Sequence, residues 1–209
     1  MHRRRLLTAT MPAAASSCAS FSLHAQAPVT KLLVGATPGG GTDIVARALA
    51  LEMAERLGRT YVVDNRPGAA GNIAALAVAR AAPDGNTLLL SYTSHAINAS
   101  LYPTLPFDPL KDFTPLCGVA SLPAILVGKK SLKASSISEL VTLAKANPGS
   151  LNLAIAGLGS ANHLAGEMHK RDAGIDIVSV PYKGTSPALA DVVAGQIDSA
   201  AETSAWGPF

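Results

Sequence analysis

Short apolar runs alternate with longer segments in which apolar residues recur every three or four positions. The short runs are typical of buried strands and the longer segments are typical of helices. In the first half of the chain this pattern predicts three strands and two helices. The predicted strands are 31–34, 61–63 and 87–90, and the predicted helices are 42–57 and 72 to about 83.

The first predicted helix has clear signals at both ends. Thr42 is the expected N-cap, Asp43 suits the first turn, and Gly58 is the expected stop. The apolar positions expected to face the sheet are Ile44, Val45, Ala48, Leu49, Met53 and Leu57.

A second alternating series follows a proline-rich connection at 102–115. The predicted strands of this series are 124–127, 151–155, 176–180 and 197–201, and the predicted helices are 136–146, 157–173 and 186–194. Strands that alternate with helices at this spacing indicate parallel sheets covered on both faces. The sequence therefore predicts an α/β protein built from two such units.

The first 27 residues have the features of a cleaved export signal. Arg3, Arg4 and Arg5 precede an apolar stretch, and Ala25-Gln26-Ala27 has the small-x-small form that a signal peptidase accepts. The arginines fit a twin-arginine signal, and the general secretory route stays open. We therefore expect a mature protein in the periplasm.

Removing this leader changes the charge balance. The leader holds three of the 17 basic residues and none of the 14 acidic ones, so 14 of each remain. The pI near 9.0 thus describes the leader, and with 4% aromatic residues the chain lacks the basic, base-stacking surface of a nucleic-acid-binding protein. Cys117 is the one cysteine after residue 27, so no internal disulfide is expected.

Three loops at expected strand ends lack bulky side chains, namely 37–42, 68–72 and 156–160. In an open parallel sheet, ligands bind at the carboxyl ends of strands, where loops present main-chain N–H groups and helix N-termini. Glycine lets a ligand approach the backbone closely, and a helix N-terminus favours an anion. The three loops together predict a carboxylate site, whereas a single loop of this kind is also typical of a tight turn.

Nucleotide binding fits these loops poorly. The spacing from Gly35 to Gly40 nearly matches a phosphate-binding loop, but Gly41 stands where that loop needs its lysine. Gly157 and Gly159 begin a dinucleotide fingerprint, but Asn162 takes the place of its third glycine. We therefore expect no cofactor.

Two further kinds of site are weaker alternatives. An exported serine hydrolase could use Ser160 or Ser94 with a histidine, although Ser160 lacks the flanking glycines of a nucleophile elbow. His163 and Glu167 would share a helical face, but two candidate ligands are too few for a metal prediction. We expect neither catalysis nor a bound metal.

An ordered series of motifs closely resembles the substrate-binding receptors of tripartite tricarboxylate transporters, called Bug receptors. The motifs are Pro38-Gly39-Gly40-Gly41-Thr42-Asp43, Asn65-Arg66-Pro67-Gly68, Ala82-Pro83-Asp84-Gly85-Asn86-Thr87-Leu88, His95-Ala96-Ile97-Asn98, Leu101-Tyr102-Pro103, His163-Leu164-Ala165-Gly166-Glu167 and Val180-Pro181-Tyr182-Lys183-Gly184. The resemblance implies a two-lobed, periplasmic-binding-protein-like clamshell with parallel-rich sheets. It also implies capture of a small carboxylate, such as a dicarboxylate, tricarboxylate, amino acid or aromatic acid, for a membrane permease.

The resemblance also implies a set of ligand-binding residues and a division of the chain. Glu202 belongs to the set, although the family commonly has an aspartate there. The implied residues are Pro38, Gly39, Gly40, Gly41, Thr42, Ser91, Ser94, His95, Gly157, Gly159, Ser160, Asn162 and Glu202. The expected division is a signal peptide at 1–27, a first lobe at 28–119, a second lobe at 120–204, and the start of a truncated return segment at 205–209. Because family members continue further, we expect a receptor shortened at its C-terminus.

Overall fold

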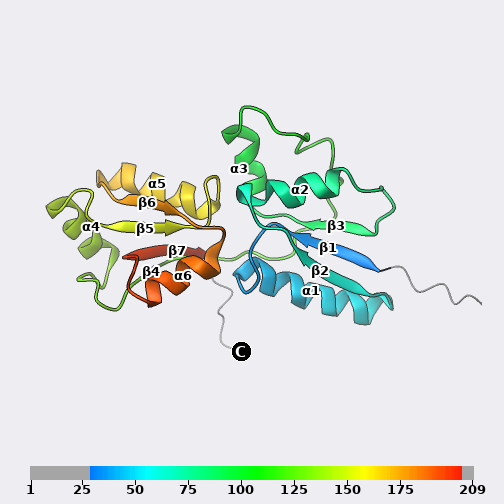
Figure 1. Ribbon diagram of the computed structural model, residues 1–209, viewed down its shortest axis with the longest axis horizontal. Helices are drawn as coiled ribbons and strands as arrows, with labels where there is room; N and C mark the ends of the chain where they lie inside the picture. The colour runs from blue at the N-terminus through cyan, green and yellow to red at the C-terminus, as the bar shows by residue number, and fades with distance from the viewer. Residues whose placement is uncertain (1–28, 204–209) are drawn as a thin grey trace, which may run out of the picture.

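The computed structural model describes residues 29–203, so the predicted leader and the segment from 205 onward lie outside the described residues. Two β-sheets lie side by side, each with helices packed on it, and together they form two lobes (Figure 1). This arrangement confirms the predicted two-lobed α/β class with parallel-rich sheets.

The first sheet contains three parallel strands in the order β2-β1-β3. The strands are β1 (Thr30–Val34), β2 (Tyr61–Asn65) and β3 (Thr87–Leu90), and the helices are α1 (Gly41–Leu57), α2 (Asn72–Ala79) and α3 (Ser94–Leu101), with a 3₁₀ turn, η1 (Ala69–Gly71). Helices α1 and α2 lie on opposite sides of this sheet (Figure 1). The last three residues of central strand β1, Leu32, Leu33 and Val34, are therefore apolar and buried, whereas Lys31 is exposed.

The second sheet has the order β4-β7-β5-β6. Its elements are β4 (Ala124–Gly128), α4 (Ile137–Ala146), β5 (Asn152–Ile155), α5 (Ala161–Ala173), β6 (Val178–Pro181), α6 (Thr185–Val193) and β7 (Ser199–Thr203). Strand β5 is buried on both faces, because Leu153 and Ile155 pack with α4 while Ala154 packs with α6. Helix α4 begins at a side-chain cap, since Ser136 Oγ accepts a hydrogen bond from Glu139 N at 3.2 Å.

Strand β4 departs from the predicted parallel pattern, because it runs antiparallel to β7. The parallel prediction rested on crossover helices, which return the chain to the same end of a sheet. No helix or strand occurs between Leu101 and Ala124. The chain enters β4 directly from the first lobe, without a crossover helix, so nothing requires β4 to run parallel to its neighbour.

The structure corrects the predicted boundaries and buried face of α1. Gly40, not Thr42, is the N-cap, and the helix begins at Gly41. Ala46 and Ala50 are buried against the sheet, and the predicted Val45 and Leu49 pack partly buried against the same core, while Ile44 and Leu57 are 42% and 57% exposed. Small side chains let the helix axis approach the strands closely, so the helix turns its alanine stripe inward and leaves the larger residues at the margin.

Two other local predictions also need correction. Helix α2 ends at Ala79 with Arg80 as its C-cap, several residues before Pro83. Helix α3 was not predicted, since its eight residues are too short for a clear apolar period. No helix among residues 29–203 combines the length and apolar character that crossing a bilayer requires.

A buried ion pair ties the second sheet together. Lys129 Nζ lies 2.6 Å from Asp198 Oδ1, and Asn152 N donates to Asp198 Oδ2 at 2.8 Å. Burial alone would raise the pKa of Asp198, but the hydrogen bonds from Lys129 and Asn152 outweigh it and hold the pKa below its usual value. The carboxylate is therefore stabilised in its charged form.

Replacing Lys129 with methionine is expected to lower the free energy of unfolding by about 2 kcal/mol at pH 7, because Asp198 keeps its charge and loses its countercharge. Since the folded pKa is depressed, the contribution is complete above the ordinary pKa of 3.8 and disappears as the pH falls through the lower folded value. Urea unfolding at pH 7 and pH 3 measures both effects. The control is R56M, which removes the exposed pair with Glu52. Its free energy of unfolding should fall by less than about 0.5 kcal/mol. Equal losses in the two variants would contradict the prediction.

Candidate functional site

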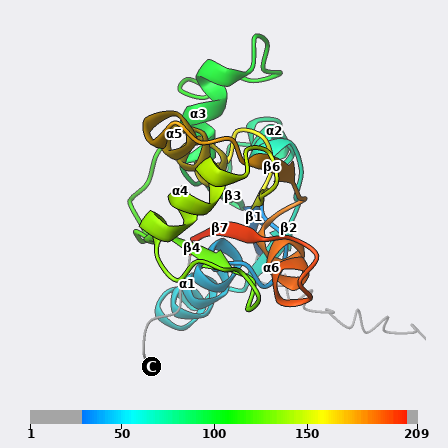
Figure 2. The ribbon, with the colours of Figure 1, turned by 90° about the vertical axis from the view of Figure 1, so that its left-hand side faces the viewer.

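The glycine loops meet where the two lobes touch. Ser186 Oγ, at the start of α6, donates a hydrogen bond to Pro38 O at 2.9 Å. Gly159, in the loop before α5, packs against Ala70 and Asn98 of the first lobe. Helices α1 and α6 lie on the same side of the sheets in both ribbon views (Figures 1 and 2). All three loops singled out in the sequence therefore border one junction.

Asp43 holds the first loop in shape. This carboxylate is 2% exposed and accepts hydrogen bonds from Gly39 N at 2.9 Å, Arg47 Nε at 2.9 Å and Asn65 Nδ2 at 2.8 Å. Burial by itself raises the pKa of Asp43. The hydrogen bonds from Arg47, Gly39 and Asn65 lower the same pKa by more, so the net shift is downward. Asp43 thus stays charged, and the hydrogen bond that it accepts from Gly39 N holds the loop in its conformation.

This network limits which N–H groups of the first loop can meet a ligand. Gly39 N is committed to Asp43, and Gly40 N faces Thr37 O at 3.5 Å. The N–H groups of Gly41 and Thr42 open helix α1 and have no acceptor within the helix. Of the five predicted residues in this loop, these two offer the clearest donors.

The second loop packs against the ends of β1 and β3. Tyr92 Oη donates to Gly35 O at 3.1 Å and lies against Gly71. Burial raises the pKa of Tyr92 to about 12, so the phenol is neutral at any physiological pH. Ala69 and Ala70 have φ values of 46° and 50°, a conformation that non-glycine residues seldom adopt. The loop is therefore held in shape by its surroundings.

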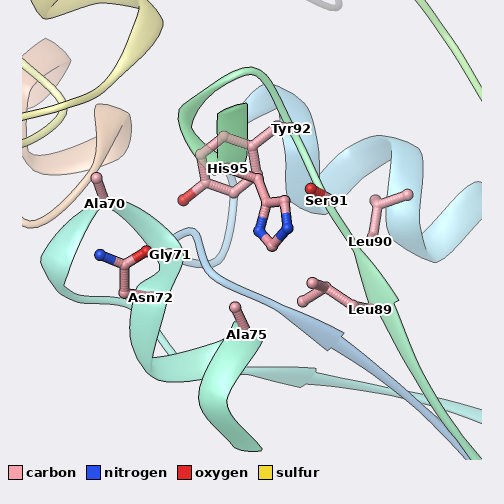
Figure 3. A pocket seen from close by; sticks show the side chains of 9 residues that line it. All are labelled: Ala70, Gly71, Asn72, Ala75, Leu89, Leu90, Ser91, Tyr92 and His95. Carbon is pink, nitrogen blue, oxygen red and sulfur yellow. The ribbon is translucent and has the colours of Figure 1, made fainter. Parts of the chain in front are cut away.

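A pocket lies at the carboxyl end of β3 in the first lobe (Figure 3). Its lining residues are Ala70, Gly71, Asn72, Ala75, Leu89, Leu90, Ser91, Tyr92 and His95. The lining includes the predicted Ser91 and His95 and contains no lysine, arginine, aspartate or glutamate. The pocket itself, at about 10 Å³, has room for roughly one water molecule, so it contributes neutral dipoles beside the junction.

His95 is already engaged by the long connection. Its Nε2 lies 3.0 Å from Pro109 O, and its ring stacks on Phe107 with centroids 5.9 Å apart. Phe113 meets the same ring edge-on at 4.9 Å. His95 thus anchors residues 107–113 to α3 as well as lining the pocket.

Helix α3 contributes a buried polar face that the sequence reasoning mostly missed. Asn98 Nδ2 donates to Ala70 O at 3.2 Å and to Asn72 Oδ1 at 2.9 Å. Ser94 and Asn98 are completely buried, yet Ser94 Oγ and Asn98 Oδ1 have no hydrogen-bond partner within the described residues. The one signal for Asn98 was its place in the His95-Ala96-Ile97-Asn98 motif.

The second lobe presents its predicted residues at the start of α5. Ser160 Oγ accepts from His163 N at 3.1 Å, so Ser160 is the helix cap, and Gly159 N donates to His163 Nδ1 at 3.3 Å. Asn162 is 4% exposed, and its Oδ1 has no partner in the described part of the chain. Of Glu202 only the main chain is described, paired with Ile125 in β7.

These contacts do not support the hydrolase alternative at the two named serines. The ring of His163 accepts from Gly159 N, and Ser160 Oγ is bound to main chain instead of to that ring. The ring of His95 is directed to Pro109 and the phenylalanines. Neither serine therefore has its neighbouring histidine as a general base.

Glu167 has a structural partner in place of a metal. Lys170 Nζ lies 2.6 Å from Glu167 Oε1, and Ser179 Oγ donates to the same oxygen at 2.8 Å. His163 Nε2 is more distant from it, at 3.8 Å. No group of three or more potential metal ligands occurs within residues 29–203.

Comparison with known proteins gives a consistent result. Residues 45–209 match the model of the tripartite tricarboxylate transporter family receptor. Protein BugT of Bordetella pertussis is 40% identical over 169 residues, which are 80% of this chain and 52% of BugT. The chain spans 52% to 60% of the length of four curated relatives that it matches.

Solved structures show the same likeness. Rpa4515 of R. palustris, solved with adipate, superposes with a TM-score of 0.80 at 38% identity, covering 83% of this chain and 58% of that one. MatC from Rhodopseudomonas palustris, solved with bound malate, has a TM-score of 0.76 at 36% identity, covering 83% of this chain and 60% of MatC.

Proposed function

The chain belongs to the tripartite tricarboxylate transporter receptor family, and from this premise we propose that it is a periplasmic receptor that captures a small carboxylate. The proposed partner is the membrane permease of such a transporter, to which the receptor delivers its solute. Family members are solute-binding receptors, and the expected absence of catalysis agrees with that role.

The observation that carries this proposal is the meeting of the three glycine loops at one junction. Helices α1 and α5 direct their N-termini toward it, and the neighbouring pocket has no charged lysine or arginine in its lining. Main-chain N–H groups at helix N-termini favour a negatively charged ligand. A carboxylate is the small organic anion that such neutral donors suit.

Two related proteins support an organic acid as the solute. The titles of their structures name adipate for Rpa4515 and malate for MatC, and both molecules are dicarboxylates. We therefore propose a dicarboxylate as the first class to test, with tricarboxylates, amino acids and aromatic acids as the wider range.

Malate or adipate is expected to raise the melting temperature of the purified chain. At a hundred times Kd, a ligand that binds only the folded state stabilises it by about 2.7 kcal/mol, equivalent to several degrees. The neutral diamide of adipate is the matched control, since it keeps the length and loses both charges. A folded chain that responds equally to adipate and its diamide, or to no organic acid, would refute the proposal.

Ser94→Ala separates binding from folding in the same assay. Within residues 29–203, the buried Ser94 hydroxyl makes no hydrogen bond of good geometry, so its removal should change the stability of the free chain little. If the hydroxyl binds the solute, affinity for the acid that stabilises the wild type should fall about tenfold, the effect of about 1.4 kcal/mol. Ser150→Ala is the control, because that hydroxyl bonds only to Asn147 O within the second lobe.

A further inference from the structure

Two glycine residues of the second lobe, Gly159 and Gly184, make close contacts with the first lobe. At the first contact, Gly159 packs so closely against the first lobe that a β-carbon on it would overlap Asn98 Oδ1. The same β-carbon would lie 2.9 Å from Leu101 Cδ2 and 3.6 Å from the Ala70 β-carbon. Only a glycine permits this approach.

The second contact lies on the other side of the junction. A β-carbon on Gly184 would overlap Thr37 Oγ1, and it would lie 3.0 Å from Thr37 Cγ2. Two residues later, Ser186 Oγ donates to Pro38 O at 2.9 Å. Among the described residues, this is the one side-chain hydrogen bond between the lobes.

We propose that Gly159, Gly184 and Ser186 form a clasp that determines how fully the lobes close, without any of them needing to touch the solute. The clasp contacts depend on the folded chain alone. Their effect on solute affinity rests on the function proposed above. In this role the three are positioning residues, and Gly159 serves as a lobe contact in addition to its predicted place near the ligand.

The chemistry of both glycine contacts indicates that they oppose closure. Thr37 Oγ1 and Asn98 Oδ1 are buried and have no hydrogen-bond partner in the described part of the chain. When the lobes separate, water can reach these oxygens; when the lobes close, the oxygens exchange water for the weak contact of a glycine Cα–H. Closure therefore removes two oxygens from water without a full hydrogen bond in exchange, and the Ser186 hydrogen bond offsets part of that cost.

Because the clasp contacts contribute to closure, solute affinity depends on them. The apparent affinity of a receptor falls in proportion to the fraction of molecules in the binding-competent state. A side chain at position 159 would hold the lobes apart and reduce that fraction. Loss of the Ser186 hydroxyl would do the same to a smaller degree.

The test is small-angle X-ray scattering of the full chain without added solute. Gly159→Ala is expected to increase the radius of gyration relative to the wild type. The matched control is Gly195→Ala, because Gly195 has a similar φ (77° against 85°) and nothing within 4 Å of an added β-carbon. The control has the same backbone strain and should keep the wild-type dimensions. Equal radii for the wild type and a folded Gly159→Ala variant would overturn the proposal.

Ser186→Ala provides a second arm that introduces no backbone strain. It should expand the chain slightly and weaken malate or adipate binding three- to tenfold, whereas Ser150→Ala should change neither quantity. If Gly159→Ala fails to fold, this pair decides, and unchanged scattering and affinity in Ser186→Ala would refute the clasp. A wild type that binds neither acid contradicts the proposed ligand class, but the scattering comparison still tests the clasp.

Discussion

Replacing Gly71 with alanine is expected to lower the free energy of unfolding by about 4 kcal/mol, a large part of the stability of a typical domain. Gly71 has φ 93°, and a β-carbon on it would lie 2.7 Å from Tyr92 Oη. Strained backbone costs about 1–3 kcal/mol and overpacking costs about the same again. Urea unfolding of the purified variant measures the loss.

Two comparisons separate strain from steric overlap at Gly71. Gly58→Ala places alanine at φ 62° with nothing within 4 Å, so it should cost only about 1 kcal/mol. Tyr92→Phe alone removes the hydrogen bond to Gly35 O and should cost about 1 kcal/mol. In the Gly71→Ala background, however, it removes the overlapping oxygen and should recover part of the lost stability, while the backbone strain remains. If the losses of Gly71→Ala and Tyr92→Phe simply add in the double variant, the steric explanation for Gly71 is wrong.

Replacing Asp43 with alanine is expected to cost about 3 kcal/mol and to weaken solute binding as well. The carboxylate accepts from Gly39, Arg47 and Asn65, and hydrogen bonds to a charged group are each worth about 1.5–3 kcal/mol. The loss is less than their sum because Arg47 is 55% exposed and can be hydrated. Without Asp43, the first loop loses the bond that fixes Gly39.

Glu52→Ala is a matched control for Asp43→Ala. Glu52 also pairs with an arginine four residues later on α1, at 3.0 Å, but both side chains are exposed. Its loss should cost less than about 0.5 kcal/mol and leave binding unchanged. A similar small loss for Asp43→Ala, measured by urea unfolding and by melting with malate, would contradict the structural role given to Asp43.

The Asp43 contribution also has a predicted pH dependence. Its pKa is lowered in the folded state, so the unfolded chain takes up the proton first as the pH falls. The stabilisation is complete above the ordinary value of 3.8 and is lost as the pH falls through the lower folded pKa. The stability difference between wild type and Asp43→Ala should therefore be constant from pH 5 to 8 and shrink below pH 4.

Local patterns in the sequence determined most of the secondary structure. The strand at 87–90 and the C-terminal end of α1, with Gly58 as its cap, were predicted where they are observed, because a short apolar run and a left-handed glycine are properties of a few adjacent residues. The alternation of these elements was also enough for the α/β class. The ordered motifs were enough for the family, which the comparisons confirm.

Tertiary packing decided what the local patterns left open. Periodicity favoured Ile44 and Leu57 as the inward face of α1, but contact with the sheet selected Ala46 and Ala50, because shape complementarity between helix and strands outweighs side-chain hydrophobicity. Helix α3 is short and forms where Asn98 can bond Ala70 and Asn72, residues more than twenty positions away.

The junction between the lobes also could not be predicted from local sequence patterns, because it depends on tertiary packing. The sequence identified glycine loops at 37–42, 68–72 and 156–160, but glycine is equally suited to a turn, a ligand contact and a close approach of two lobes. The choice depends on which atoms from distant parts of the chain arrive beside it. At Gly159 those atoms are Asn98 Oδ1 and Leu101 Cδ2, and no pattern of neighbouring residues encodes that distance.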